Sequence, residues 1–354
     1  MSNPGKILFG ICVSLLVAGC VEQEDVVVVP DAENILFTSA GDLLVSGGKG
    51  LYQVESTVNP DGSTAYQKTK VYSGPDCAFT GIAQSGDWVF AICKGGYIEW
   101  EGLIFSLVVD THLVAANLNE RPLDFKALDE GLDYDPLDEI VIPNGLAFTP
   151  TGHLLVADEN FFATSSVGRI TLDYSEGRPG LAGFEKDWLD NEYGFEAPNG
   201  VRVDGNTLYV SDVNKVRRLF FDAQGEVPLS FLDENGNEVS NRPEDNEFYQ
   251  GGWIIDDIMP YCGGIAVTHF FQGKLVFQTA AGEKYQTPPF SFDGPSSIAV
   301  GGGQSFDGND LLVTEKGILL ENNSNYGNRL TRVPLDYDLL DPATCEALNE
   351  LDQD

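Results

Sequence analysis

The chain has 354 residues and a net charge of −35, from 55 acidic and 20 basic side chains. Such an acidic surface repels phosphate backbones, so a nucleic-acid partner is not expected. A hydrophobic content of 42% with 21 Phe is enough for a folded core and argues against a disordered acidic chain.

The first twenty residues have the pattern of an export signal. Lys6 precedes an apolar run from Ile7 to Val17, which is too short to span a bilayer and is followed by small residues before Cys20. The segment Leu-Val-Ala-Gly-Cys ending at Cys20 resembles the lipobox of bacterial lipoproteins, although a cysteine can also occur there by chance. We therefore expect residues 1–19 to be a signal peptide and Cys20 to carry lipid that holds the exported protein to a membrane of the cell envelope. Val21 after the cysteine favours the outer membrane by the same resemblance.

Residues 20–30 follow as a short tether. The run Val26 to Val29 within it has two interpretations, a free tether or an outer strand that closes a ring of sheets.

Four further cysteines remain in what would be an oxidising compartment, enough for two disulfides. Cys77 and Cys93 flank one predicted hairpin, so we pair them. Cys262 and Cys345 are then left to pair with each other.

Two distant segments, 142–158 and 197–212, repeat nearly the same phrase. Each has Pro-Asn-Gly, a short apolar segment, a turn with Gly and a second alternating apolar segment, which is typical of an antiparallel hairpin. Weaker copies bring the number of units to six, and helical periodicity is almost absent. We therefore predict an all-β, six-bladed β-propeller over 31–338, with 339–354 as an acidic tail, and a monomer.

In a propeller the innermost strand of each blade lines a central channel. The six units would place these residues around it: Glu33, Thr80, Asn144, Asn199, Gly263 and Ser296. A carboxylate with two amide oxygens suits calcium, whereas the three histidines and scattered cysteines do not suggest zinc or copper.

Simpler interpretations of the same residues remain open. Asn-Gly is a common turn dipeptide, so Asn144 and Asn199 could only shape the start of each blade. Glu33 is one acid among 55 and could simply be solvated. Asp158 and Asp212, which close the second strands, are better explained as turn caps than as catalysts.

The Pro-Asn-Gly phrase is similar to that of the regucalcin and gluconolactonase family of six-bladed propellers. The resemblance implies that Glu33, Asn144 and Asn199 bind a divalent cation such as Ca²⁺. That family also supplies an Asp from the fifth blade as ligand and base. The corresponding point in this chain is Gly263, and two acids, Asp256 and Asp257, lie just upstream.

Two functions follow as hypotheses. The first is a lipid-anchored, divalent-metal-dependent hydrolase of lactones or related esters, with Asp257 as the base that deprotonates water. The second is a non-catalytic surface propeller that binds a protein or glycan partner and holds at most a structural calcium.

Overall fold

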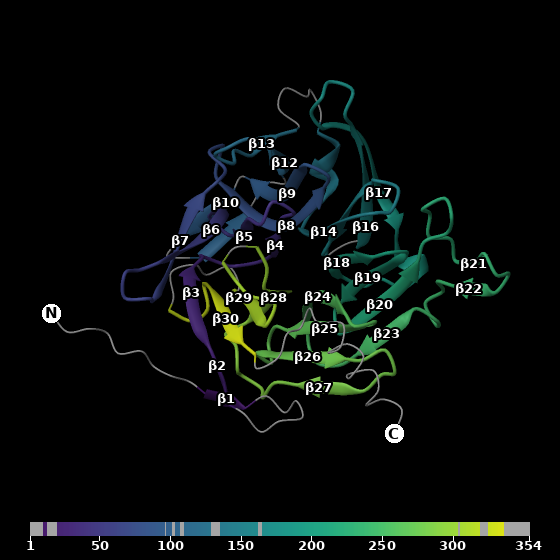
Figure 1. Ribbon diagram of the computed structural model, residues 1–354. Coiled ribbons are helices and arrows are strands. Elements are labelled where there is room, and N and C mark those ends of the chain that lie inside the picture. Colours follow the sequence, from purple (N-terminus) through teal and green to yellow (C-terminus); the bar gives the residue numbers. More distant parts are fainter. Residues whose placement is uncertain are drawn as a thin grey trace.

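The computed structural model describes residues 10–12, 20–95, 97–100, 103–106, 110–128, 135–161, 165–303, 305–318 and 325–335. Six four-stranded antiparallel sheets stand around a common axis (Figure 1), so the prediction of a six-bladed β-propeller is confirmed. Cys345 and the predicted tail, 339–354, lie outside the described residues. Among the described residues no helix has the length and apolar character needed to cross a membrane.

Each blade runs from an inner strand at the axis to an outer strand at the rim. Blade 1 contains, in that order, β4 (Ile35–Phe37), β5 (Leu43–Gly47), β6 (Gly50–Val58) and β7 (Thr64–Lys70). Blade 2 contains β8 (Cys77–Ser85), β9 (Trp88–Gly95), β12 (Thr111–Asn117) and β13 (Lys126–Ala127). Blade 3 contains β14 (Pro143–Phe148), β15 (Leu154–Asp158), β16 (Ser166–Asp173) and β17 (Gly180–Leu189).

The second half of the ring repeats this order. Blade 4 contains β18 (Pro198–Asp204), β19 (Thr207–Asp212), β20 (Lys215–Phe220) and β23 (Glu247–Gln250). Blade 5 contains β24 (Ile255–Tyr261), β25 (Gly264–His269), β26 (Lys274–Gln278) and β27 (Lys284–Gln286). Blade 6 contains β28 (Pro295–Val300), β29 (Asp310–Glu315), β30 (Arg329–Pro334) and β3 (Glu24–Val28).

Among the described residues, three strand pairs and two short helices lie outside the six four-stranded sheets. They are the pairs β1 (Gly10–Cys12) with β2 (Cys20–Glu22), β10 (Tyr97–Trp100) with β11 (Leu103–Ser106) and β21 (Ser230–Leu232) with β22 (Glu238–Ser240), and the short 3₁₀ helices η1 (Pro136–Glu139) and η2 (Asn191–Tyr193).

The N-terminal strand β3 closes the ring by pairing with β30. Of the two interpretations of the run Val26 to Val29, the outer strand is therefore the one observed. The propeller consequently starts at Glu24, earlier than the predicted boundary at Asp31, and part of the predicted tether at 20–30 belongs to blade 6.

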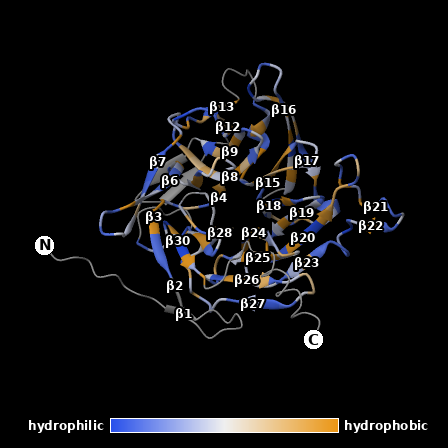
Figure 2. Ribbon diagram, in the orientation of Figure 1, coloured by the Kyte–Doolittle hydropathy of each residue, from blue (hydrophilic) through white to orange (hydrophobic). Residues whose placement is uncertain are grey.

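The core is divided among the spaces between blades. Each of six buried apolar clusters joins one blade to the next, such as the cluster that packs Leu155 of blade 3 on Val210 of blade 4. The outermost strands β7 and β27 are mostly hydrophilic, and apolar residues concentrate nearer the axis (Figure 2). The fold thus accommodates a long chain by adding blades, without enlarging a single core.

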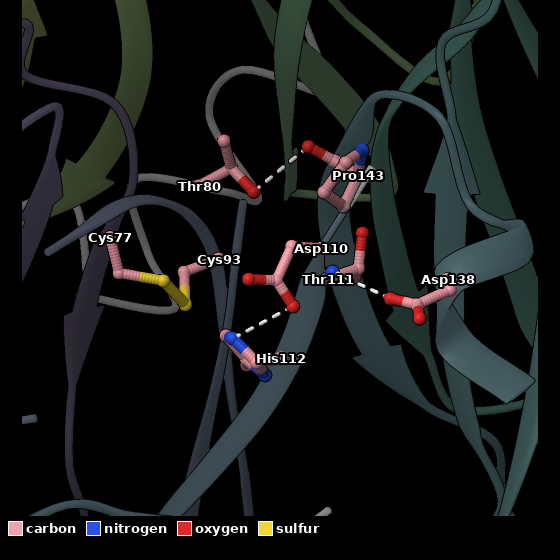
Figure 3. The surroundings of a disulfide bond; sticks show 8 residues. All are labelled: Cys77, Thr80, Cys93, Asp110, Thr111, His112, Asp138 and Pro143. Carbon is pink, nitrogen blue, oxygen red and sulfur yellow. Dashed lines mark hydrogen bonds and ion pairs between the residues drawn. A yellow bond between two sulfur atoms is a disulfide. The ribbon is translucent and has the colours of Figure 1, made fainter. Parts of the chain in front are cut away.

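A disulfide joins Cys77 on β8 to Cys93 on β9, the pair that the hairpin pattern predicts, with 5.6 Å between the Cα atoms (Figure 3). Cys262 is also disulfide-bonded. Near the first disulfide, the Thr80 hydroxyl donates to the Pro143 carbonyl at 3.0 Å and so ties blade 2 to blade 3.

The inner strand of the fifth blade is β24, and Gly263 lies in the turn between β24 and β25 with φ of +74°. The prediction that Gly263 begins this strand is therefore wrong. The apolar run after Gly263 has the sequence pattern of an inner strand, but it forms the second strand. The residue that corresponds to Asn144 and Asn199 is Asp256.

Candidate functional site

The inner strands share an irregularity where they begin. In blades 3, 4 and 5 the pairing with the second strand slips after the first residue, between Pro143 and Leu146, Pro198 and Val201, and Ile255 and Ile258. The second residue of each strand, which is Asn144, Asn199 or Asp256, falls in this bulge, a device that re-aims side chains. Glu33 takes the corresponding place just before β4.

Glycine follows the bulge residue where neighbouring inner strands come very close. A Cβ atom on Gly145 would lie 2.7 Å from the Asn199 carbonyl oxygen, and one on Gly81 would lie 2.3 Å from that of Asn144. The Asn-Gly dipeptide therefore serves the packing of strands at the axis.

Hydroxyl groups of the second strands fix the backbone at these positions. Ser211 accepts from the Gly200 N–H at 2.7 Å and donates to the Asp256 carbonyl at 2.9 Å. Thr314 donates to the Glu33 carbonyl at 2.6 Å. We call such a hydroxyl, which bonds to the inner strands of two neighbouring blades, a hydroxyl clasp. The clasps of Thr314 and Ser211 fix the backbone of Glu33 and of Asp256, respectively.

Six polar side chains meet at this end of the channel, and we call them the polar centre. They are Glu33, Asn144, Glu159, Asn199, Asp256 and Lys316. Lys316 forms an ion pair with Glu33. Nδ2 of Asn144 lies 3.5 Å from Oε2 of Glu159, and Asn199 also hydrogen-bonds Glu159.

The predicted residues Glu33, Asn144 and Asn199 are thus brought together, whereas Glu159 and Lys316 are members that the repeat pattern does not predict. Each directly follows the acid that closes a second strand, Asp158 or Glu315. Because these strands run antiparallel to the inner strands, their last residues lie beside the first residues of the inner strands. Applied to the sequence, this geometric rule would have identified Glu159 and Lys316 as members of the centre.

The carboxylates of the polar centre are held away from water. Burial raises the pKa of Glu159 to about 7, although hydrogen bonding to Asn199 opposes the rise. Burial and then the neighbouring charge of Glu33 raise the pKa of Asp256 well above its ordinary value. Burial lowers the pKa of Lys316, but the carboxylates of Asp31, Glu33 and Asp256 outweigh this and raise it overall. The centre therefore has three carboxyl groups for one ammonium, and two of these carboxyl groups have raised pKa values that favour their protonated forms.

Asp257 lies next to Asp256 but outside the polar centre. Its carboxylate pairs with Arg202 and accepts from the Ser297 hydroxyl at 2.5 Å and from the Ile258 N–H at 2.8 Å. Burial raises the pKa of Asp257, and Arg202 opposes that rise. The predicted base is thus engaged in structural contacts.

Arg202 also donates to Oδ1 of Asn34 at 2.7 Å. Arg202 comes from blade 4 and Asn34 from blade 1, which are opposite one another in a ring of six, so the Arg202 side chain crosses the channel. The polar centre therefore lies at one end of a channel that Arg202 obstructs.

Asp158 and Asp212 are turn caps, as predicted. Asp158 Oδ1 accepts from the Val141 and Ile142 N–H groups at 3.1 and 2.8 Å. Asp212 Oδ1 accepts from Glu196 and Ala197 at 2.8 and 2.7 Å. Both hold the segment that leads into an inner strand.

The donor set of the polar centre fits a hard divalent cation. An asparagine that gives its NH₂ group to Glu159 keeps its carbonyl oxygen for another partner, so Asn144 and Asn199 can both offer oxygen. When all are ionised, three carboxylates and one ammonium sum to −2, which a divalent cation would neutralise. Within the described ranges no group of three or more His, Cys, Asp or Glu side chains is arranged to hold a metal, so such a site depends on its asparagines.

A pocket of about 390 Å³ lies elsewhere, near the Cys77–Cys93 disulfide, and includes none of the polar centre. Its lining consists of Tyr72, Ser73, Gly74, Pro75, His112, Phe125, Lys126 and Ala127.

Known structures share this fold at low sequence identity. A gluconolactonase from Xanthomonas campestris matches with a TM-score of 0.55 and 14% identity, over 94% of this chain and 98% of the other. The fold is that of the gluconolactonase and regucalcin propellers. A luciferin-regenerating enzyme matches with a TM-score of 0.53 and 12% identity, over 90% and 98% of the two chains.

Regucalcin from Agrobacterium tumefaciens, described as a calcium-binding protein, matches with a TM-score of 0.50 and 14% identity over 89% and 95% of the chains. No protein-family model matches the sequence. No curated protein matches it either. At these identities the likeness establishes the fold alone, and the activity has to be argued from the polar centre.

Proposed function

We propose that this protein is a divalent-cation-dependent hydrolase of lactones or related esters. The observation that carries the proposal is the convergence of Glu33, Asn144, Asn199 and Asp256 from four different blades on one end of the channel. These four side chains would hold the cation, for which Ca²⁺ is the first candidate because all their donors are oxygen atoms. A bound cation would polarise the substrate carbonyl and stabilise negative charge on its oxygen.

The remaining groups have defined tasks in this proposal. Glu159, which lies beside the proposed ligands Asn144 and Asn199, is placed to take a proton from the attacking water. Asn144 and Asn199 orient its carboxylate through their NH₂ groups. Ser296, whose hydroxyl donates to Asp256 Oδ2 at 2.8 Å, keeps that carboxylate directed at the centre. Glu159 replaces Asp257 as the proposed base because Asp257 is occupied by Arg202.

We also propose that the protein is exported and anchored through a lipid on Cys20. Strand β3 starts at Glu24, at the end of blade 6 opposite the polar centre, because it pairs antiparallel with β30. A membrane bound at Cys20 would therefore lie on the far side of the ring from the polar centre. In this arrangement the end of the ring that carries the polar centre would face away from the membrane, towards a small-molecule substrate in solution.

A panel of lactones and esters tests the activity, assayed with excess calcium and with a chelator. The expected result is turnover of at least one member that falls with the chelator and is lost in Asn199→Ala. Absence of metal-dependent turnover across the panel would contradict the proposal.

One observation favours the second hypothesis, a non-catalytic propeller that binds a partner. Exposed aromatic side chains lie on loops at the same end of the ring as the polar centre: Trp253 (75% exposed), Phe271 (51%) and Phe290 (79%). Their loops adjoin, since the Phe290 N–H donates to the Gln272 carbonyl at 2.8 Å. Calcium-dependent stabilisation without turnover of any substrate would support this hypothesis.

A further inference from the structure

Lys316 gives the polar centre a positive charge of its own. Its backbone is fixed where β29 ends, because the Lys316 N–H donates to the Gly294 carbonyl at 2.9 Å. Its ammonium pairs with Glu33 and lies within electrostatic reach of Asp256 and Glu159. One amine thus interacts with every carboxylate of the centre.

The surroundings of Lys316 show that this contact is specific. The preceding residue, Glu315, is held by Arg329 at 3.0 Å and by the Thr331 hydroxyl, so it does not compete for Lys316. The Lys316 side chain is 14% exposed and that of Glu33 is 2% exposed, so the lysine side chain keeps some contact with solvent while that of its partner is almost fully buried. Lys316 can therefore move away at a smaller cost than Glu33.

Lys94 shows what a lysine does at the same place in another blade. Cys93 pairs with Phe79 on the inner strand of blade 2, and Glu315 pairs with Pro295 on the inner strand of blade 6. The residues that follow them, Lys94 and Lys316, therefore occupy equivalent positions. The Lys94 amine donates to the Val141 carbonyl at 2.7 Å. A lysine at this position therefore does not always pair with a carboxylate of the polar centre. The ion pair with Glu33 is a feature of Lys316 in blade 6.

We propose that Lys316 is a resident counter-ion of the polar centre, which stabilises the metal-free protein and must withdraw from Glu33 before a divalent cation binds. The inference rests on the proposed function, because it takes the polar centre as the cation site. It adds that the Lys316 amine and the metal cannot occupy the position beside the Glu33 carboxylate at the same time. Lys316 would thus set how tightly the protein binds its cation.

Two opposite effects follow from replacing Lys316 with a neutral residue. The Lys316→Met variant should bind calcium about 100-fold more tightly, because a like charge is removed from a buried site where charges interact strongly. Without calcium the same variant should melt at a lower temperature than the wild type, because three carboxylates then lack a counter-charge. Saturating calcium should abolish this difference.

Calorimetric titration of calcium and thermal melting with chelator test both effects on the full chain. Lys94→Met is the matched control and should leave calcium affinity within about twofold of the wild type, since its amine donates to the Val141 carbonyl and its electrostatic partner is Asp158, which is not in the polar centre. Lys316→Arg keeps the positive charge and should keep the weaker, wild-type affinity. Should Lys316→Met fail to fold without metal, competition with a chelator of known calcium affinity, starting from the calcium-loaded proteins, provides the same comparison.

The outcomes separate this inference from the proposed function. Equal or weaker calcium binding by Lys316→Met overturns the inference, while metal-dependent turnover by the wild type would still stand. Binding by Lys316→Met alone supports the inference and rejects a calcium-dependent activity of the wild type. Absence of binding in both proteins rejects both ideas.

Discussion

Two adjacent aspartates on β24, Asp256 and Asp257, differ in the groups that surround their carboxylates. Asp257 is satisfied by Arg202, Ser297 and its neighbour's N–H, and these contacts join blades 4, 5 and 6. Asp256 faces the polar centre, where it lies near two more carboxylates and one shared amine. The first arrangement is a structural connection, while the second leaves a carboxyl group that is neutralised either by a proton or by a further cation.

A buried acid is thus informative only when its partners are known. Both aspartates are buried, at 6% and 2% exposure, and burial raises the pKa of both. The difference lies in what compensates the charge. We therefore assign the functional role to Asp256, because the protein does not place enough positive charge beside its carboxylate to balance it.

The largest expected effect concerns stability. Asp257→Asn should lower the free energy of unfolding by about 4 kcal/mol, because it leaves the Arg202 guanidinium without its charged partner. Asp256→Asn, the matched change one residue away, should leave the stability of the metal-free protein unchanged or raise it, because it removes a repulsive charge. Urea denaturation with a chelator measures both, and an equal loss in the two variants would remove the distinction.

A smaller effect is expected from pH. Glu159 has an ordinary pKa of 4.5 that the fold raises to about 7, so between these values the folded protein holds a proton that the unfolded chain has released. Stability from this group is fully present below about pH 4.5 and is lost as the pH rises through about 7, by about 3 kcal/mol. Glu159→Gln should flatten this part of the pH profile of the free energy of unfolding, measured with a chelator. A profile identical to that of the wild type would contradict it.

The smallest effect tests the hydroxyl clasps. Ser211→Ala and Ser46→Ala each remove a hydroxyl that links two inner strands, and each should cost about 1 kcal/mol of stability. Ser211 holds the carbonyl of the proposed ligand Asp256, whereas Ser46 accepts from the Asn34 N–H beside Glu33 and donates to the Thr80 carbonyl at 2.5 Å. Ser211→Ala should also weaken calcium binding, by about threefold to tenfold, and should do so more than Ser46→Ala, which does not bond to a ligand residue directly. Equal binding in the two variants would mean that the clasp does not position the ligand.

The sequence predicts the fold well because the fold repeats. The Pro-Asn-Gly phrase and its hairpin occur twice in nearly the same form, and weaker copies of the pattern bring the number of blades to six. The structural roles of Asp158 and Asp212 are also predictable, although the N–H groups that they hold lie 16 and 15 residues earlier in the chain.

Two features of the polar centre could not be predicted in the same way. Blade 5 lacks the Pro-Asn-Gly phrase, so the apolar run of its second strand looks like an inner strand and puts Gly263 in the place of Asp256. Arg202 shows the other difficulty, because its partner Asn34 is 168 residues away and lies across the channel. This hydrogen bond forms only because the closed ring brings blades 1 and 4 to opposite sides of one channel. A local sequence pattern does not contain that information.

The most direct test of the polar centre as a cation site is a calorimetric titration of calcium into the wild type, Asp256→Asn and Asp257→Asn. We expect one calcium per wild-type molecule, loss of at least about 100-fold in affinity in Asp256→Asn, and binding close to the wild type in folded Asp257→Asn. Calcium binding that survives in Asp256→Asn, or that is lost only in Asp257→Asn, would contradict the assignment.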